Sequence, residues 1–211
     1  GVNHDGNFEK AKLLVDIATE ANVDAVKFQT WKTENLIMKK TSKANYQKKQ
    51  TGKGTQFDMI KKLELSYDEF KKLKQYCETK GLIFLSTPDD EESAKFLYKI
   101  GVSAFKIGSG ELNNLIYLKY LAKFEKPLIL STGMGTLEEV KKARDTIYKE
   151  GNKELIILHA TTDYPTKFED VNLRVMQTIR YKLNVLIGYS DHTLGTDVPI
   201  VALSLGANLI E

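Results

Sequence analysis

Seven short apolar runs recur along this chain of 211 residues, and stretches with helical periodicity lie between them. The runs have strand length, and most are rich in β-branched or aromatic residues, which is typical of strands buried on both faces. They occupy residues 25–28, 82–85, 104–107, 128–130, 155–158, 185–187 and 208–210. Strands that alternate with helices predict parallel βαβ units.

The stretches between the runs have the apolar spacing of amphipathic helices. Helices are predicted at residues 8–20, 67–79, 90–99, 114–123, 137–149, 172–181 and 197–205. Residues suited to cap a helix N-terminus precede three of these stretches, namely Ser66, Asp89 and Thr136. Glycines suited to a left-handed C-terminal cap follow three of them, namely Gly81, Gly101 and Gly151.

This order of elements predicts an α/β fold. Residues 1–4 look like the exit of an eighth strand, and eight βα units predict a (β/α)8 TIM barrel, whose usual length is about 250 residues. A doubly wound open sheet is the alternative, although no glycine-rich dinucleotide motif follows any strand. We expect a single domain over residues 1–211, a barrel cropped at both ends.

The composition is that of an ordinary globular protein, with 42% hydrophobic and 28% charged residues. A net charge of +3, with acids and bases interleaved, argues against nucleic acid as a partner. The lysine-rich stretch 39–53 is either a solvated loop or a flap that attracts an anionic substrate. One cysteine and no apolar run of membrane-spanning length predict a cytoplasmic protein with no membrane partner.

Polar side chains gather at the carboxyl ends of the predicted strands, which is where TIM barrels carry their chemistry. In chain order they are Asn3, His4, Lys27, Gln29, Ser86, Thr87, Lys106, Ser109, Glu111, Ser131, Thr132, His159, Thr161, Thr162, Ser190, Asp191 and His192. A barrel without a site has no need of lysines and histidines at so many strand ends. The pattern therefore predicts a polar pocket on one face.

Two lysines suggest what this pocket binds. Lys27 and Lys106 each lie inside an apolar strand, where a buried ammonium needs an anionic partner. With serines and glycine-rich loops nearby, they suit a phosphate or carboxylate ligand. A salt bridge at the strand end and a Schiff-base lysine are the alternatives. His192 is either a metal ligand or a hydrogen-bonded structural residue, and His159 is expected to be buried beneath the pocket.

Seven motifs, in matching order, resemble the sialic acid synthase family, which includes N-acetylneuraminate, legionaminate and pseudaminate synthases. They are "GVNHDGNFEKAKLLVDIATEA", "VKFQT", "FLSTP", "FKIGSGELNN", "PLILSTGM", "LHATTDYPT" and "GYSDHTLG". The resemblance implies a TIM barrel that condenses phosphoenolpyruvate with an N-acylated amino-sugar aldehyde such as N-acetylmannosamine. It also implies a transferase that makes a nine-carbon 2-keto sugar acid and phosphate, with Mn²⁺ or Mg²⁺ as cofactor. A homodimer is implied for the full-length form, together with a small antifreeze-like C-terminal domain that lies outside these 211 residues.

The resemblance also assigns site residues. Those implied to hold phosphoenolpyruvate are Lys27, Lys106, Ser109, Ser131 and Ser190, with Thr87 and Thr162 as further substrate contacts. Those implied to face the sugar are Gln29, Glu111 and Tyr164. Glu111 and Lys106 are expected to be catalytic, and His192 to bind the metal. Asp191 is expected to hold neighbouring backbone.

The chain departs from the family pattern at three positions. Ala160 stands where relatives commonly have Cys, Thr162 where they have Ser or Asn, and Asp89 where they have Phe. These departures bear on sugar choice or local packing and not on the reaction. Two other functions stay open: a Schiff-base aldolase that uses Lys106, and a phosphate-ligand-binding barrel without activity.

Overall fold

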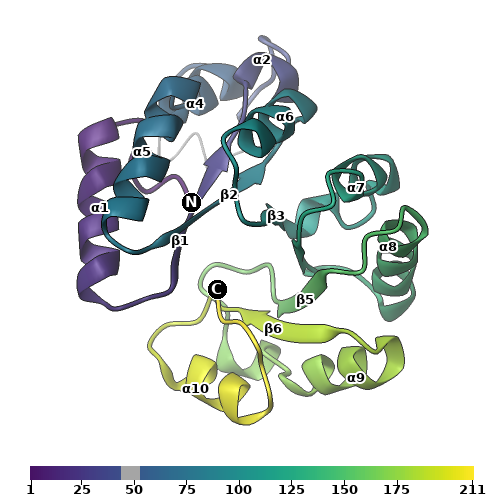
Figure 1. Ribbon diagram of the computed structural model, residues 1–211. Helices are drawn as coiled ribbons and strands as arrows, with labels where there is room; N and C mark the ends of the chain where they lie inside the picture. The colour runs from purple at the N-terminus through teal and green to yellow at the C-terminus, as the bar shows by residue number, and fades with distance from the viewer. Residues whose placement is uncertain (44–52) are drawn as a thin grey trace. The chain divides into compact units, whose positions relative to one another are not determined.

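The computed structural model describes residues 1–43 and 53–211, which divide into two compact units, Gly1–Ser103 and Ala104–Glu211. Part of the lysine-rich stretch, including Lys48 and Lys49, lies outside the described residues. Each unit is built from strands that alternate with helices (Figure 1).

The first unit has two parallel strands, β1 (Ala25–Thr30) and β2 (Ile83–Pro88). The helices in its described residues are α1 (Phe8–Glu20), α2 (Thr33–Leu36), α4 (Gln56–Leu63), α5 (Tyr67–Thr79) and α6 (Glu91–Lys99). Phe28 of β1 stacks on Phe84 of β2 with ring centroids 5.6 Å apart, and it meets Phe70 of α5 edge-on at 6.4 Å. Because side chains alternate along a strand, Lys27 and Gln29 lie on the opposite face of β1.

The second unit has four parallel strands, β3 (Phe105–Ile107), β4 (Leu128–Ser131), β5 (Leu155–Ala160) and β6 (Leu186–Ser190), paired in that order. Its α-helices are α7 (Leu115–Ala122), α8 (Leu137–Lys149), α9 (Arg174–Leu183) and α10 (Asp197–Ser204). Two 3₁₀ turns, η1 (Ser109–Glu111) and η2 (Phe168–Asp170), follow β3 and β5. Phe105, on the helix side of β3, packs edge-on against Phe124.

Most predicted elements are confirmed. The helices at 8–20, 67–79 and 137–149 have the predicted bounds, and the three predicted glycine caps have positive φ angles of 74°, 78° and 92°. The predicted N-cap Asp89 is wrong: Asp90 caps α6, because its carboxylate accepts the Ser93 N–H at 2.8 Å. The short helices α2 and α4 were not predicted.

The two outermost predicted strands differ from expectation. Residues 208–210 form a single parallel bridge, between Ile210 and Tyr189, and not a full strand. Residues 1–4 hold no strand in the described chain, although the Gly1 amino group donates to the Lys27 carbonyl at 2.8 Å.

Gly188, in the middle of β6, is required by the close approach of residues 208–211. The Tyr189 N–H donates to the Leu209 carbonyl, and the Glu211 N–H donates to the Tyr189 carbonyl, both at 2.9 Å. A Cβ at position 188 would lie 2.4 Å from the Leu209 carbonyl oxygen and 2.6 Å from a methyl carbon of Leu158. Only glycine lets this segment pair beside β6.

Gly188→Ala is therefore expected to lower the free energy of unfolding by about 1–3 kcal/mol, the usual cost of overpacking. Gly110→Ala is the matched control, because a Cβ there meets no atom within 4 Å. The control is expected to stay within about 0.5 kcal/mol of wild type. Equal denaturation midpoints for the two variants would contradict the close approach.

Candidate functional site

Lys106 is the centre of a buried polar cluster in the second unit. Its side chain is 5% exposed, and its Nζ donates to the Ser131 Oγ at 2.8 Å and to the Ile107 carbonyl at 3.3 Å. The same Nζ lies 3.1 Å from the Oε2 of Glu211. The predicted anionic partner of Lys106 thus exists within the chain, and it is a residue that the sequence interpretation missed. The signal was present, since Glu211 directly follows the apolar run 208–210.

The register of the strands places three predicted residues on one face of the second sheet. Lys106 pairs with Ile129, Ser131 with Leu158, and Ala160 with Ser190. With the alternation of side chains, Lys106, Ser131 and Ser190 all project from the face opposite to Phe105. Ser131 is 3% and Ser190 is 5% exposed, so this face carries two buried hydroxyls, and that of Ser131 accepts from the ammonium.

The loops after β3, β4 and β5 approach one another at Gly133. The Gly133 N–H donates to the Ser109 Oγ at 2.9 Å. A Cβ at this glycine would lie 2.1 Å from the Oγ1 of Thr162 and 3.0 Å from the Oγ of Ser109. The structure therefore brings Ser109 and Thr162 together around Gly133, where there is no room for a side chain.

His192 follows β6 and has a defined tautomer. Its Nδ1 lies 2.7 Å from the Thr161 carbonyl, and since a carbonyl only accepts, Nδ1 carries the proton. The lone pair is then on Nε2, which is the arrangement of a histidine that binds metal through Nε2. The ring of Tyr164 lies beside the imidazole, with centroids 4.3 Å apart. Asp191 holds the turn as predicted, because its Oδ1 accepts from the N–H and Oγ1 of Thr193.

His192 is one oriented ligand and not a complete metal site. Within residues 1–43 and 53–211, no group of three or more His, Cys, Asp or Glu side chains is placed to hold a metal ion. A cation there would need oxygen ligands from a substrate, from water or from other protein groups. The residue fits the predicted role, and the role stays a prediction.

His159 lies beneath this face, as predicted. It is 8% exposed, its Nε2 lies 2.7 Å from the Val171 carbonyl, and its ring packs against Tyr189 with centroids 5.7 Å apart. Burial lowers the pKa of His159, so the ring is neutral and donates through Nε2. Burial, and then the Asp191 carboxylate, raise the pKa of the Tyr189 phenol to about 12. Both groups are structural at neutral pH.

The remaining predicted residues are distributed as follows. Glu111 ends η1, and its Oε2 accepts from the Asn114 Nδ2 at 2.7 Å. In the first unit, Gln29 pairs with Thr87 across β1 and β2, and both lie on the face that carries Lys27. Thr87 is 4% exposed, whereas Lys27 and Gln29 are half-buried.

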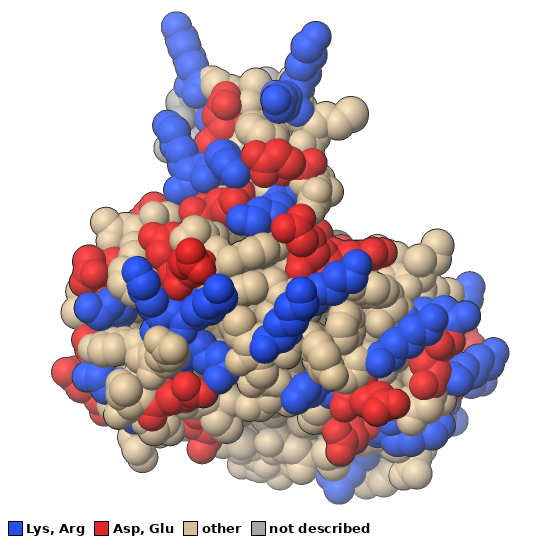
Figure 2. Space-filling view, turned by 45° about the horizontal axis from the view of Figure 1, so that its top comes forward, with Lys and Arg blue, Asp and Glu red and all other residues tan. Residues whose placement is uncertain are grey.

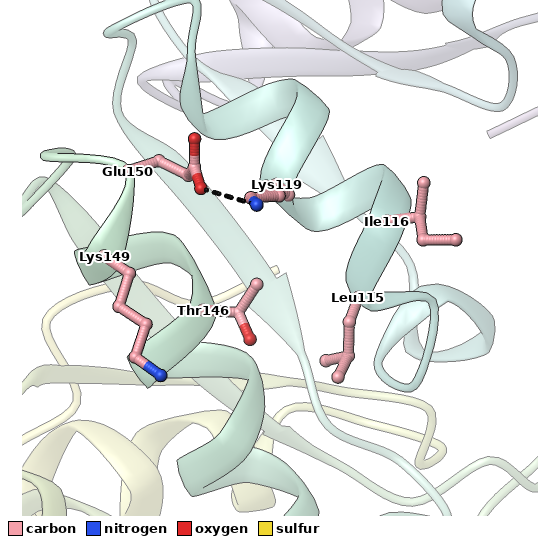
Figure 3. A pocket seen from close by; sticks show the side chains of 6 residues that line it. All are labelled: Leu115, Ile116, Lys119, Thr146, Lys149 and Glu150. Carbon is pink, nitrogen blue, oxygen red and sulfur yellow. Dashed lines mark ion pairs between the residues drawn. The ribbon is translucent and has the colours of Figure 1, made fainter.

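A hollow of about 290 Å³ lies on the outside of the second unit, between α7 and α8 (Figure 3). Its lining consists of Leu115, Ile116, Lys119, Thr146, Lys149 and Glu150, and it includes none of the predicted site residues. Lys119 pairs with Glu150 at 3.3 Å. On the face shown in Figure 2, acidic and basic side chains are interleaved, without a broad basic area. No helix in the described part of the chain is long and apolar enough to cross a membrane.

Comparison with known proteins identifies close relatives. Residues 14–211 match the NeuB family. The chain is 45% identical to an N,N'-diacetyllegionaminic acid synthase of Legionella pneumophila and 34% identical to the N-acetylneuraminate-9-phosphate synthase of Homo sapiens. Both alignments cover 100% of this chain, which spans 61% and 59% of the length of these two relatives.

A solved structure confirms the fold. The crystal structure of an N-acetylneuraminic acid synthetase from Leptospira borgpetersenii in complex with citrate superposes with a TM-score of 0.87 at 31% identity. The match covers 100% of this chain and 69% of that one. The predicted α/β fold of the TIM-barrel type is therefore confirmed.

The Lys106–Glu211 pair generates a prediction with a definite sign. Glu211→Gln is expected to strengthen binding of inorganic phosphate about tenfold, because it removes a negative charge beside the ammonium that would hold the anion. Glu150→Gln is the matched control, since Glu150 also pairs with a lysine and is similarly exposed, at 17% against 21%. Isothermal titration of the intact protein measures both. Weaker phosphate binding by Glu211→Gln would contradict the assignment.

Proposed function

Because the chain belongs to the NeuB family, we propose that it carries the catalytic part of a synthase that joins phosphoenolpyruvate to an N-acylated amino-sugar aldehyde. The products are a nine-carbon 2-keto sugar acid and inorganic phosphate. The observation that carries the proposal is the buried ammonium of Lys106 beside the Ser131 hydroxyl. A buried charged donor beside a hydroxyl supports the binding of an anionic substrate, and the names of the relatives give the class of product, an acidic sugar.

Binding of phosphoenolpyruvate is the first task of these residues. Its phosphate and carboxylate need charge-assisted donors, and Lys106 supplies one at the end of β3. Ser109, Ser131 and Ser190 supply hydroxyl donors, and Gly133 lets backbone approach the same place. We propose Lys27 and Thr87 as further contacts to the substrate. The Leptospira relative was crystallised with citrate, which is likewise a multiply charged anion.

The proposed reaction forms one carbon–carbon bond and one carbon–oxygen bond, the latter to water, and breaks the carbon–oxygen bond to phosphate. The enol carbon C3 attacks the aldehyde carbon, and the aldehyde oxygen becomes a hydroxyl by taking a proton. Water adds to the former enol carbon C2, and the resulting tetrahedral intermediate expels phosphate. Glu111 is the proposed proton-transfer group, and Gln29, Thr162 and Tyr164 are proposed to orient the sugar. These assignments follow the matching motifs.

His192 is proposed to bind a divalent cation, Mn²⁺ or Mg²⁺. When bound, such an ion supplies Lewis-acid polarisation of the aldehyde. The part of the chain described here contributes the Nε2 lone pair of His192, oriented by the Thr161 carbonyl.

The Schiff-base alternative is less well supported by the geometry. A Schiff base needs a neutral amine as nucleophile. Lys106 is instead paired with the Glu211 carboxylate at 3.1 Å, which favours the charged ammonium.

The proposed function is tested by mass spectrometry of the products that the intact protein makes. Phosphoenolpyruvate is offered with acetamido sugars that carry one or two acetamido groups, since the relative at 45% identity is named for a diacetylated product. A 2-keto sugar acid and an equal amount of phosphate are expected. Lys106→Ala is expected to raise the KM for phosphoenolpyruvate about 10- to 150-fold, the equivalent of a lost charge-assisted bond of ~1.5–3 kcal/mol.

Lys119→Ala is the control for Lys106→Ala, because Lys119 lies on the outer hollow. If the protein binds phosphate but forms no product, the result would favour a phosphate-ligand-binding barrel without activity. Borohydride trapping of pyruvate on Lys106 would favour the aldolase.

Removal of metal tests the role of His192. Activity is expected to disappear with EDTA and to return with Mn²⁺. His192→Ala is expected to stay inactive in Mn²⁺ while its circular dichroism stays unchanged, because the imidazole lies in a loop and not in the core. Full activity after exhaustive chelation would refute the metal assignment.

A further inference from the structure

Thr166 stands out in the loop between β5 and α9. Of residues 161–170 it alone is buried, with 5% of its surface exposed. A buried threonine in an otherwise exposed loop needs partners for its polar atoms. The structure supplies partners for its N–H and its hydroxyl, and these partners include or contact His192.

The backbone and the hydroxyl of Thr166 bond in two directions. Its N–H donates to the His192 carbonyl at 2.8 Å. Its single hydroxyl proton is shared between two acceptors, the Asp163 carbonyl at 2.8 Å and, more weakly, the Thr161 carbonyl at 3.3 Å. The Thr161 carbonyl is the same group that accepts the Nδ1 proton of His192 at 2.7 Å. Thr166 and His192 are therefore linked twice, once through backbone and once through a shared acceptor.

We propose that Thr166 is a positioning residue that fixes the tautomer and orientation of His192 by holding the Thr161 carbonyl in place. The metal-binding half of this inference rests on the proposed function, and the tautomer half does not. A fixed Thr161 carbonyl keeps the proton on Nδ1 and leaves Nε2 as the lone-pair nitrogen. Hydrogen bonds of this kind set the basicity and direction of histidine ligands.

The loop has other anchors, so the effect of Thr166 is separable from loop folding. The Thr161 Oγ1 donates to the Asp170 carbonyl at 3.2 Å. His159 bonds to the Val171 carbonyl at 2.7 Å, at the far end of the loop. Loss of the Thr166 hydroxyl leaves these bonds and its own N–H bond in place. What it removes is the support beneath the Asp163 and Thr161 carbonyls.

The first test reads the tautomer directly in the metal-free intact protein. Nitrogen-15 NMR of the histidine ring, assigned by the signal lost in His192→Gln, is expected to show a protonated Nδ1 in wild type. Thr166→Val is expected to give averaged Nδ1 and Nε2 shifts, the sign of mixed tautomers. Thr166→Ser is expected to restore the wild-type pattern. Thr178→Val is the control, because that hydroxyl bonds to the Arg174 carbonyl within α9.

The second test measures Mn²⁺ affinity by electron paramagnetic resonance of the free ion. Thr166→Val is expected to weaken binding about 10- to 100-fold, the usual effect of losing a ligand's supporting bond. Thr166→Ser and Thr178→Val are expected to bind within twofold of wild type. Thr166→Ala replaces the valine variant if circular dichroism shows that the latter is unfolded.

The outcomes separate the two proposals. A folded valine or alanine variant with the wild-type tautomer would overturn the role of Thr166. Wild-type protein that binds no Mn²⁺, but whose tautomer depends on Thr166, would refute the metal site and leave the positioning role standing. Mixed tautomers in Thr178→Val would show a general loosening of the fold and would also overturn the inference.

Discussion

The buried ammonium of Lys106 sets the conditions for the whole carboxyl end of the second unit. Removing a charge from water costs several kcal/mol, which is comparable to the whole free energy of unfolding of a small domain. Lys106 is tolerated because Ser131 and Glu211 surround it. Glu211 can reach it only because residues 208–211 pair beside Tyr189, and that pairing needs the missing side chain of Gly188. The buried charge of Lys106 in β3 is thus linked to the absence of a side chain at Gly188 in β6, three strands along the sheet.

The positions of two histidines relative to their strands separate their roles, and they bear on His192, whose role the sequence leaves open. His159 lies within β5 and points to the helix side, where burial keeps it neutral and where it bonds to Val171. His192 lies beyond the end of β6, where it is half-buried and bonds to Thr161 through Nδ1. Only the second has its remaining nitrogen available in a position next to Tyr164. His159 is structural because it lies inside a strand, and His192 is a candidate ligand because it lies after the end of one.

The sequence predicts the parts of this fold that depend on local chemistry. The helices α5 and α8, of 13 residues each, are predicted from their apolar periodicity, and their N-termini are predicted from the capping residues Ser66 and Thr136. The helix α2 is absent from the prediction because four residues are too few for a clear period. The helix α4, which was also not predicted, has no buried residue. The sequence cannot distinguish Asp89 from Asp90 as the N-cap of α6, because either aspartate can cap and only the backbone geometry selects Asp90. Thr166 gave no signal, since its partners are carbonyls that the fold brings to it.

The loop between β5 and α9 is fixed at both ends and exposed between them. Its first residue is held by the ring of His192, and its end is held by the ring of His159, on the other side of the sheet. Between these two hydrogen-bonded ends, residues 162–165 are exposed to solvent. Changes in these four residues alter the surface that the loop presents at very little cost in stability. Such a loop can change its exposed side chains while the hydrogen bonds at its two ends keep His159 and His192 in their positions.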